Sequence, residues 1–373
     1  MASGRLSRAK GKILDIPANA PTIGTATAGS ESASITFTAA ADTSVGGPIF
    51  QYTAKSNPGS VTGTATTSPV TVSGLTVGTS YTFTVAASNP SGNSPFSAAS
   101  NSAVPIASPK ATGGTASNDG TYWYHAFTSS GTFTPTQSLT ADILVIAGGG
   151  GASSYSGGGG GGAGGLAAYT SQSLTTTGYT VTIGNGGAAE TKGNNSVFGA
   201  LTAAVGGGQS TTRGAAGSVG GSGGGGSAAA DGGGTVINGG AGTAGQGNAG
   251  GSGKHLSGGY ESGGGGGGAS EVGESGTSPS TGRGGNGSSA YSAWGLATTT
   301  GQNVSGTVYY AGGGAGYNSA TGGLGGGGQA GASRGTAAQN GTINTGGGGG
   351  SGQTNITSGG SGGRGIVIVR YAI

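Results

Sequence analysis

The sequence predicts an all-β chain with little or no α-helix, in which a β-sandwich precedes a β-framed bundle of left-handed polyglycine II helices. Residues 21–107 alternate between polar and apolar types, which is the period of half-buried strands. Residues 1–112 contain only 11 of the 96 glycines, so 85 lie in the remaining 261 residues. Two segments built around apolar runs, Asp142–Ala147 and Gly365–Tyr371, enclose most of those glycines. We expect these two segments to pair and to tether everything between them.

Residues 1–20 form a short basic segment without periodicity, which carries a net charge of +3, equal to the formal excess of the whole chain. We expect either a loose tail or a docking arm that orders against another protein of the same assembly. Its docking side chains are then Arg5, Arg8, Lys10 and Lys12. Because the rest of the chain is balanced in charge, no basic surface for nucleic acid is predicted.

Residues 21–107 are predicted to form about seven short strands, the number typical of an immunoglobulin-like sandwich. Segments with period two are Ser34–Thr38, Ile49–Tyr52, Val70–Val72 and Tyr81–Val85. Clusters of Gly, Pro, Asn and Ser separate them, as expected for turns between strands.

Within this region, Leu75–Tyr81, Thr82–Ala87 and Asn89–Gly92 together resemble a fibronectin type III domain. The resemblance implies that Tyr81 is a tyrosine-corner residue, with its hydroxyl bonded to the backbone a few residues upstream. Phe37 stands where the family usually has tryptophan. The sequence contains no Arg-Gly-Asp tripeptide, so integrin-style adhesion is not implied. The resemblance to this family implies a spacer or a weak surface binder.

Residues 108–120 are predicted to be a polar linker, and residues 121–373 a glycine-rich module. Segments 143–146 and 366–369 are continuously apolar, which predicts strands buried on both faces. Further strands are expected at Tyr122–Phe127, Gly131–Thr134, Gly178–Ile183 and Ser196–Phe198. Tight turns are expected at the Asn-Gly dipeptides, which begin at Asn185, Asn238, Asn286 and Asn340.

The glycine runs raise a thermodynamic problem. Ordering a residue costs about 1–2 kcal/mol, and a hydrogen bond returns a net of only about 0.5–1.5 kcal/mol. Glycine has no side chain to bury, so a run orders only if nearly every N–H and C=O finds a partner on another run. Left-handed helices with three residues per turn, packed side by side, allow this arrangement. The alternative is a flexible Gly/Ser linker, but then the C-terminal apolar strand would have no partner.

Residues 120–373 are similar to the glycine-rich modules at the ends of bacteriophage tail fibres and adhesins. The similarity rests on the motifs Ala141–Gly151 and Gly362–Tyr371. It implies a virion protein that contacts the host or decorates the particle.

The sequence offers no catalytic, cofactor-binding or metal-binding residues, so we do not expect an enzyme. Without cysteine, disulfides and thiolate metal sites are excluded, and the two histidines lie in different segments. Acidic residues are too few and scattered for a glycosidase pair. Neither a secretory signal nor a membrane-spanning segment is predicted. A polar body without an export signal fits a virion surface protein made in the host cytoplasm and released by lysis.

Aromatic residues interrupt the glycine runs where loops are expected to emerge, and rings on a rigid base are efficient contact groups. The alternative is that these rings cap the bundle and shield its hydrogen bonds. The candidate receptor contacts are Tyr155, Tyr260, Tyr291, Trp294 and Tyr317.

We therefore expect a non-enzymatic bacteriophage structural protein, displayed as a tail-fibre or adhesin module. Its expected partners are other virion proteins and a host-surface glycan or protein, and we expect a homo-oligomer, with a trimer as the first choice. Two alternatives stay open: a capsid or tail decoration protein without a receptor, and an ice-binding or matrix protein.

Overall fold

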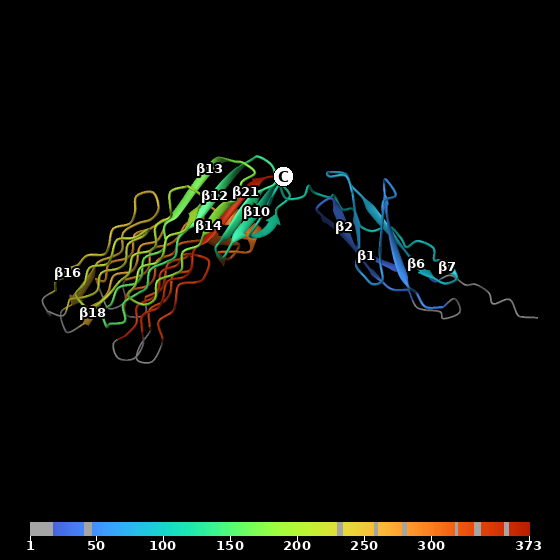
Figure 1. The fold of residues 1–373 in the computed structure, drawn as a ribbon. Coiled ribbons are helices and arrows are strands. Elements are labelled where there is room, and N and C mark those ends of the chain that lie inside the picture. Colours follow the sequence, from blue (N-terminus) through green and yellow to red (C-terminus); the bar gives the residue numbers. More distant parts are fainter. Residues whose placement is uncertain are drawn as a thin grey trace, which may run out of the picture. The chain divides into compact units, whose positions relative to one another are not determined.

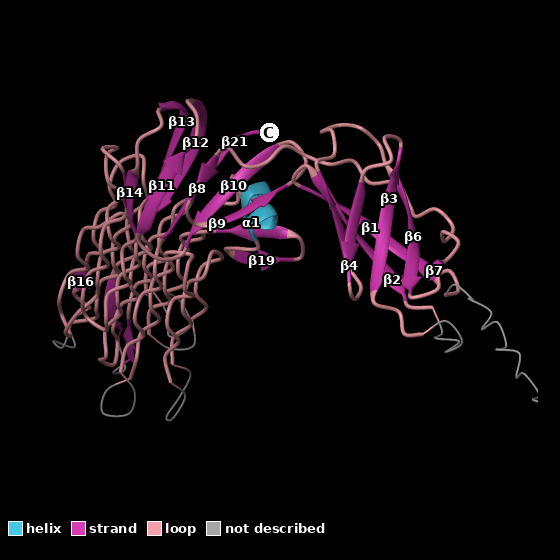
Figure 2. Ribbon diagram, turned by 45° about the vertical axis from the view of Figure 1, so that its right-hand side comes forward, coloured by secondary structure: helices cyan, strands magenta, loops and turns pink. Residues whose placement is uncertain are grey.

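The computed structural model describes residues 18–40, 47–229, 234–256, 260–277, 282–317, 320–331, 337–353 and 358–373. The chain forms two compact units, residues 1–109 and 110–372 (Figure 1). The described residues are almost entirely strands and extended chain, with one short helix, α1 (Ser292–Thr298) (Figure 2). The predicted all-β fold is confirmed. The proposed docking residues Arg5, Arg8, Lys10 and Lys12 lie outside the described residues.

The first unit is a sandwich of two antiparallel sheets. One contains β1 (Thr22–Gly29), β2 (Ser32–Thr38) and β5 (Val70–Ser73). The other has the order β4 (Thr62–Ala65), β3 (Gln51–Asn57), β6 (Thr82–Asn89) and β7 (Gly92–Asn93). Alternate residues of these strands form the buried core, as the period of two predicts.

The tyrosine corner is present: the backbone N–H of Thr76 donates a hydrogen bond to the Tyr81 hydroxyl at 3.1 Å. Phe37 is buried, and its ring centroid lies 4.5 Å from that of Tyr52. An aromatic pair therefore fills the part of the core where tryptophan was expected.

The second unit begins with two sheets, which we call the base. A five-stranded sheet has the order β13 (Leu166–Leu174), β12 (Leu139–Ile146), β21 (Ile366–Ala372), β10 (Tyr122–Phe127) and β9 (Thr115–Asn118). A four-stranded sheet has the order β15 (Val197–Phe198), β14 (Tyr179–Thr182), β11 (Gly131–Pro135) and β8 (Ala111–Thr112). The predicted pairing of the two apolar segments is confirmed, with Val145 opposite Val367. The linker prediction is wrong for residues 111–118, because β8 and β9 pair with strands of the base.

Both faces of β12 and β21 are buried, as the continuous apolar runs predict. On one face the ring of Phe133 contacts the rings of His125, Phe198 and Tyr371. The other face packs against α1 and the hairpin of β19 (Gln302–Val304) and β20 (Thr307–Tyr309). The residues of this second cluster include Leu144, Ile146, Ile366, Ile368, Trp294, Val308 and Tyr310.

Beyond the base, the glycine runs form a lattice in which hydrogen-bond partners repeat every third residue. In residues 148–153, the N–H groups of consecutive residues donate to three different runs in turn. The N–H groups of residues i and i+3 therefore donate to the same run. A period of three is the signature of a polyglycine II helix. The donor–acceptor pairs are Gly148 with Asn194, Gly151 with Thr191, Gly149 with Gly363, Ala152 with Gly360, Gly150 with Gly162, and Ser153 with Gly159.

The run at residues 158–165 lies at the centre of this lattice. Its backbone N–H and C=O groups bond to six other segments, namely residues 147–153, 205–208, 222–227, 264–267, 314–317 and 346–349. Saturating the backbone in this way offsets the entropy lost by ordering glycine. The packed bundle, rather than the flexible linker, is what the chain forms.

Close approach of the runs explains why glycine is required at the centre. A Cβ added to Gly161 would lie 2.1 Å from the carbonyl oxygen of Gly150. Added to Gly266 or Gly348, it would lie 1.9 or 2.0 Å from the carbonyl oxygen of Gly161. The obstacles are backbone atoms, which cannot move aside without breaking lattice bonds.

The turn prediction for the four Asn-Gly dipeptides is wrong. A type I′ turn needs positive φ at both residues, and none of these eight residues has it. All four dipeptides lie within extended runs of the lattice. The short strands β16 (Val236–Ile237), β17 (Gly253–Leu256) and β18 (Tyr260–Ser262) occur where runs approach the end away from the base (Figure 1).

Candidate binding end of the glycine-rich unit

The end of the second unit opposite the base, which we call the distal end, is the candidate site. Residues 148–153 continue from β12, and residues 158–165 lead into β13. The turn at residues 154–157 that joins them therefore lies as far from the base as these runs reach. Strands β16 to β18 lie at the same end (Figure 1).

Two of the predicted contact residues meet at this turn. The N–H of Gly158 donates to the carbonyl oxygen of Tyr155 at 2.9 Å, and the N–H of Tyr317 donates to the carbonyl oxygen of Gly158 at 2.9 Å. The lattice thus places the backbones of two tyrosines, far apart in sequence, on either side of one glycine. Tyr155 is 38% exposed and Tyr317 is half-buried.

Polar side chains support the same turn. The Glu190 carboxylate accepts a hydrogen bond from the backbone N–H of Ser154 at 3.1 Å. Glu261 of β18 forms an ion pair with Arg213, and its Cβ lies close to Gly157. Strand β18 also contains the predicted contact residue Tyr260, so the backbones of three of the five predicted residues gather around this turn.

The other two predicted residues are at the base, so their assignment to the emerging loops is wrong. Trp294 is only 6% exposed and packs edge-on against Tyr291 and Tyr124, with centroids 5.4 and 6.2 Å away. Trp294 lies on α1 and Tyr291 directly precedes that helix, and both side chains pack in the apolar cluster on the five-stranded sheet. A sequence signal existed: residues 288–298 contain one glycine, at 295, which marks an element outside the lattice.

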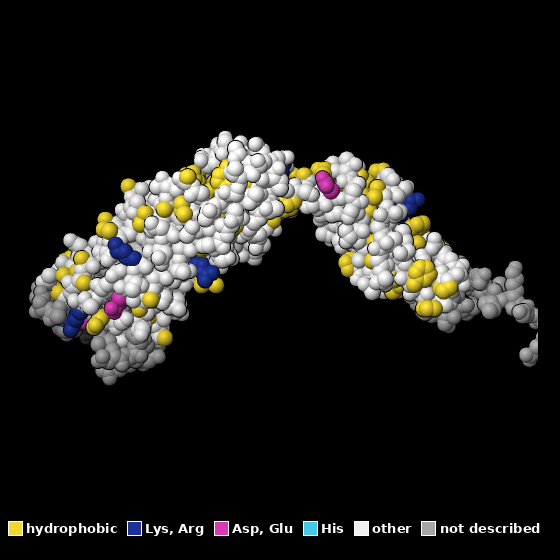
Figure 3. All heavy atoms as spheres, viewed as in Figure 1, with side chains coloured by type: hydrophobic (Ala, Val, Ile, Leu, Met, Phe, Trp, Pro, Cys, Tyr) yellow, Lys and Arg dark blue, Asp and Glu magenta, His cyan; other side chains and the backbone are white. Residues whose placement is uncertain are grey.

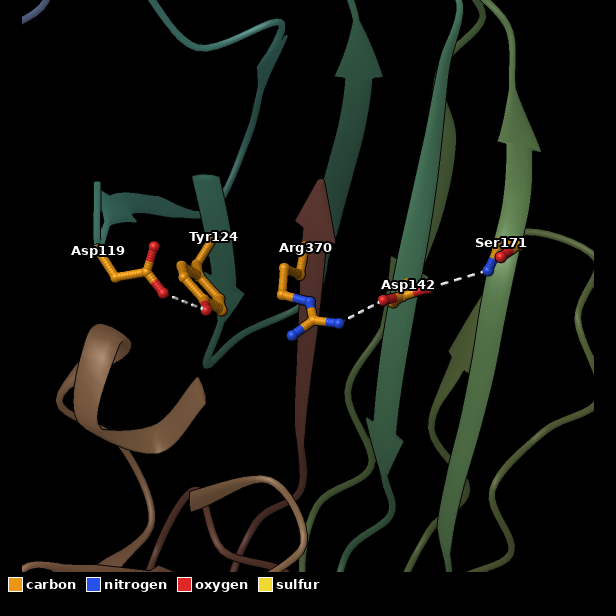
Figure 4. A network of polar contacts seen from close by, with 5 residues as sticks. All are labelled: Asp119, Tyr124, Asp142, Ser171 and Arg370. Atoms are coloured by element: carbon orange, nitrogen blue, oxygen red, sulfur yellow. Dashed lines mark hydrogen bonds and ion pairs between the residues drawn. The ribbon is translucent and has the colours of Figure 1, made fainter. Parts of the chain in front are cut away.

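Charged groups on the five-stranded sheet form a polar network (Figure 4). The Arg370 guanidinium bonds to the Asp142 carboxylate at 2.6 Å and lies 4.4 Å from the ring centroid of Tyr122. Burial raises the pKa of Asp142, but the bonds from Arg370 and the Ser171 N–H outweigh it and lower that pKa. Burial, followed by the hydrogen bond to Asp119, raises the pKa of Tyr124 to about 12. Each group is held in its ordinary charge state.

His125 is buried between the two sheets of the base. Its Nδ1 lies 2.6 Å from the carbonyl oxygen of Gly113, and its Nε2 lies 2.9 Å from the Tyr371 hydroxyl. Burial lowers the pKa of His125, and the Gly113 hydrogen bond offsets this only in part. The neutral imidazole joins β10 to its neighbours, and this is a structural role.

This lowered pKa predicts acid sensitivity of the second unit. The pKa of histidine in the unfolded chain is about 6.5. Below that pH the unfolded chain binds a proton that the folded chain does not, so the free energy of unfolding falls as the pH decreases. The slope reaches at most about 1.4 kcal/mol per pH unit. We expect His125→Phe to be destabilised at neutral pH and to lose this slope. Asp142 contributes a separate loss only below about pH 4, because its folded pKa is depressed.

Tryptophan fluorescence during denaturant unfolding measures this in the whole chain, because Trp123 and Trp294, the chain's two tryptophans, both lie in the second unit. An unchanged acid slope in the variant would mean that another group titrates.

In the part of the chain that the structure describes, no helix is long and apolar enough to span a membrane. The described residues also include no group of three or more His, Asp or Glu side chains arranged to hold a metal ion. Charged side chains are sparse on the visible face of the second unit (Figure 3).

Comparisons with known proteins identify both units. The family model described as "Glycine-rich domain" matches residues 128–372, and that of the fibronectin type III domain matches residues 19–103. Both are domain types that are typically non-catalytic. No curated protein matches the chain.

Among solved structures, a segment of titin is 26% identical, with a TM-score of 0.20, over 24% of this chain and 31% of that one. The FN1–FN3 domains of chicken CNTN1 are 14% identical, with a TM-score of 0.22, over 44% of this chain and 61% of theirs. Chitinase ChiA74 from Bacillus thuringiensis is 15% identical, with a TM-score of 0.19, over 43% and 25%. The chain spans less than two thirds of each. Because the matching family model covers well over half of its length, the chain belongs to the glycine-rich domain family, with a fibronectin type III domain preceding that region.

Proposed function

We propose that this chain is a non-enzymatic structural protein of a bacteriophage particle, which displays the distal end of its glycine-rich unit for attachment to a host surface. The observation that carries the proposal is the arrangement of the second unit. The chain enters through β8 and leaves through β21, both at the base, while the turn at residues 154–157 lies at the opposite end.

The hydrogen-bonded lattice makes this display stiff. Backbone hydrogen bonds join each pair of neighbouring runs at every third residue. The arrangement of the runs therefore does not depend on the side chains of the turns. A stiff support reduces the entropy lost when a turn is fixed against a partner. This separation of support from contact surface suits an adhesin.

Contact groups at the distal end suit a host-surface glycan or protein. Tyr155 presents a partly exposed ring. The Glu190 carboxylate bonds to the same turn, and Glu261, which pairs with Arg213, lies beside Gly157. Tyrosine combines a large apolar face with a polar tip and loses little conformational freedom on binding.

The first unit acts in this proposal as a spacer, and the basic residues Arg5, Arg8, Lys10 and Lys12 dock the chain onto other virion proteins. A homo-oligomer, with a trimer as the first choice, would cover the sides of the lattice and multiply the binding ends.

Binding of the labelled whole chain to a panel of intact bacteria tests this function. We expect binding to a subset of strains, lost in the double variant Tyr155→Ser with Tyr317→Ser. Both tyrosines bond to the turn through their backbones, so the turn should survive the change. The matched control is Val304→Ser, which changes an exposed residue of β19 at the base and should bind normally.

Immunogold labelling with antibodies to the chain places it on or off the particle. Equal binding by the double variant and the parent chain would remove the distal end from the mechanism. Labelling of particles without any binding to cells would favour the decoration alternative, and absence from particles would end the virion proposal.

A further inference from the structure

Four Asn-Gly dipeptides in the lattice share one sequence but not one environment. They are residues 185–186, 238–239, 286–287 and 340–341. None of the four lies in a helix, strand or turn, and none has a positive φ. The hydrogen bonds and the burial of the glycine are what distinguish them.

Two of the dipeptides are held by the same reciprocal pair of hydrogen bonds, which we call the Asn-Gly clamp. Asn286 Oδ1 accepts the N–H of Leu324 at 2.9 Å, and the N–H of Gly287 donates to the carbonyl oxygen of Leu324 at 2.6 Å. Asn340 and Gly341 make the same two bonds to Ser361, each 2.8 Å long. Both clamped glycines are buried.

The other two dipeptides lack this clamp. Asn185 is exposed, and neither its side chain nor the N–H of Gly186 has a hydrogen-bond partner among the described residues. Asn238 is also exposed, and its Oδ1 is 3.5 Å from the Ser252 hydroxyl, at the limit of a hydrogen bond. The N–H of Gly239 has no partner within the described ranges.

An asparagine followed by glycine can lose its amide without any enzyme. The backbone nitrogen of the glycine attacks Cγ of the asparagine, a C–N bond forms, the side-chain nitrogen leaves as ammonia, and a succinimide ring results. Water then opens the ring to aspartate or isoaspartate. The attack requires that the glycine N–H be free to lose its proton and that the asparagine side chain turn onto that nitrogen. The clamp prevents both.

We propose that Asn185 and Asn238 are sites of spontaneous deamidation in the folded protein, while the lattice protects Asn286 and Asn340. The product places a negative charge on a unit with very few charges. Isoaspartate also lengthens the backbone within a three-residue repeat. Residues 187 and 190, which bond to Gly149 and Ala152, would be put out of register, so this outer run of the lattice is expected to loosen first.

Ageing of the whole chain at mildly alkaline pH, followed by peptide mass spectrometry that separates aspartate from isoaspartate, tests the proposal. The same chain unfolded in urea gives the deamidation rate of each dipeptide in the absence of structure. The measured quantity is the ratio of the deamidation rate in the folded chain to that in the unfolded chain. Reaction of a clamped site requires breaking two hydrogen bonds. We therefore expect ratios at Asn286 and Asn340 that are about tenfold or more below those at Asn185 and Asn238.

A variant strengthens the test. Asn185→Gln should abolish modification at that site, leave the rate at Asn238 unchanged and melt normally, since the side chain of Asn185 makes no bond among the described residues. Equal ratios at all four sites, or faster reaction at Asn286 or Asn340, would overturn the proposal.

Discussion

Replacement of Gly161 by alanine is expected to destabilise the second unit by roughly 3 kcal/mol or more. Its Cβ would lie 2.1 Å from the carbonyl oxygen of Gly150, which accepts a hydrogen bond from the N–H of Gly349 at 3.0 Å. Relief of the clash requires two runs to separate and break lattice bonds. For a unit of this size the melting temperature should fall by about 6–12 °C, measured by tryptophan fluorescence.

The matched control for this change is Gly131→Ala in β11. There a Cβ would lie 3.7 Å from the Phe127 ring, an ordinary contact, and the position is exposed. Restricting the unfolded chain should leave stability unchanged or raise it by up to about 1 kcal/mol. Similar melting of both variants would mean that the runs are not packed as described.

Deletion of residues 365–373 is expected to unfold the whole second unit. This removes β21, which lies between β12 and β10 in the five-stranded sheet. Four of its residues, Ile366 to Val369, are fully buried. At about 1.5–3 kcal/mol for each buried side chain, the loss is about 6–12 kcal/mol, comparable with the total stability of a domain. The emission of both tryptophans should shift to the red, as their rings become exposed.

Deletion of Ile373 alone is the control, because the second unit ends at Ala372. This shorter deletion should leave the emission and the melting curve unchanged. Protected glycine amides in the longer deletion would instead show that the lattice closes without its C-terminal strand.

The paired strands of the base and the tyrosine corner could be predicted from the sequence, because characteristic side chains specify them. The apolar segments 143–146 and 366–369 predicted buried, paired strands, and Leu75–Tyr81 predicted the tyrosine corner. Strands β8 and β9 were missed because Ala111–Thr112 and Thr115–Asn118 are small and polar, and their order comes from pairing with β11 and β10. Tertiary context here overrides weak local propensity.

The neighbours of each glycine run could not be predicted. A run such as Gly263–Gly268 has no side chain that distinguishes one partner from another, so the period of three follows from the composition but the partners do not. The same limit applied to the candidate site. Tyr155 and Tyr317 were expected at the ends of runs, but only the lattice brings both to Gly158. Trp294 was assigned by its position among glycines, although helix α1 buries it.

Amide hydrogen exchange of the intact chain, resolved at individual glycines, tests the central claim most directly. If the runs form a packed lattice, the amides of Gly148–Gly151, Gly160–Gly165 and Gly264–Gly268 should exchange as slowly as those of β12 and β21, through unfolding of the whole unit. Exchange of these glycines at the rate of an unstructured peptide, beside protected strands, would contradict the lattice and the display function built on it.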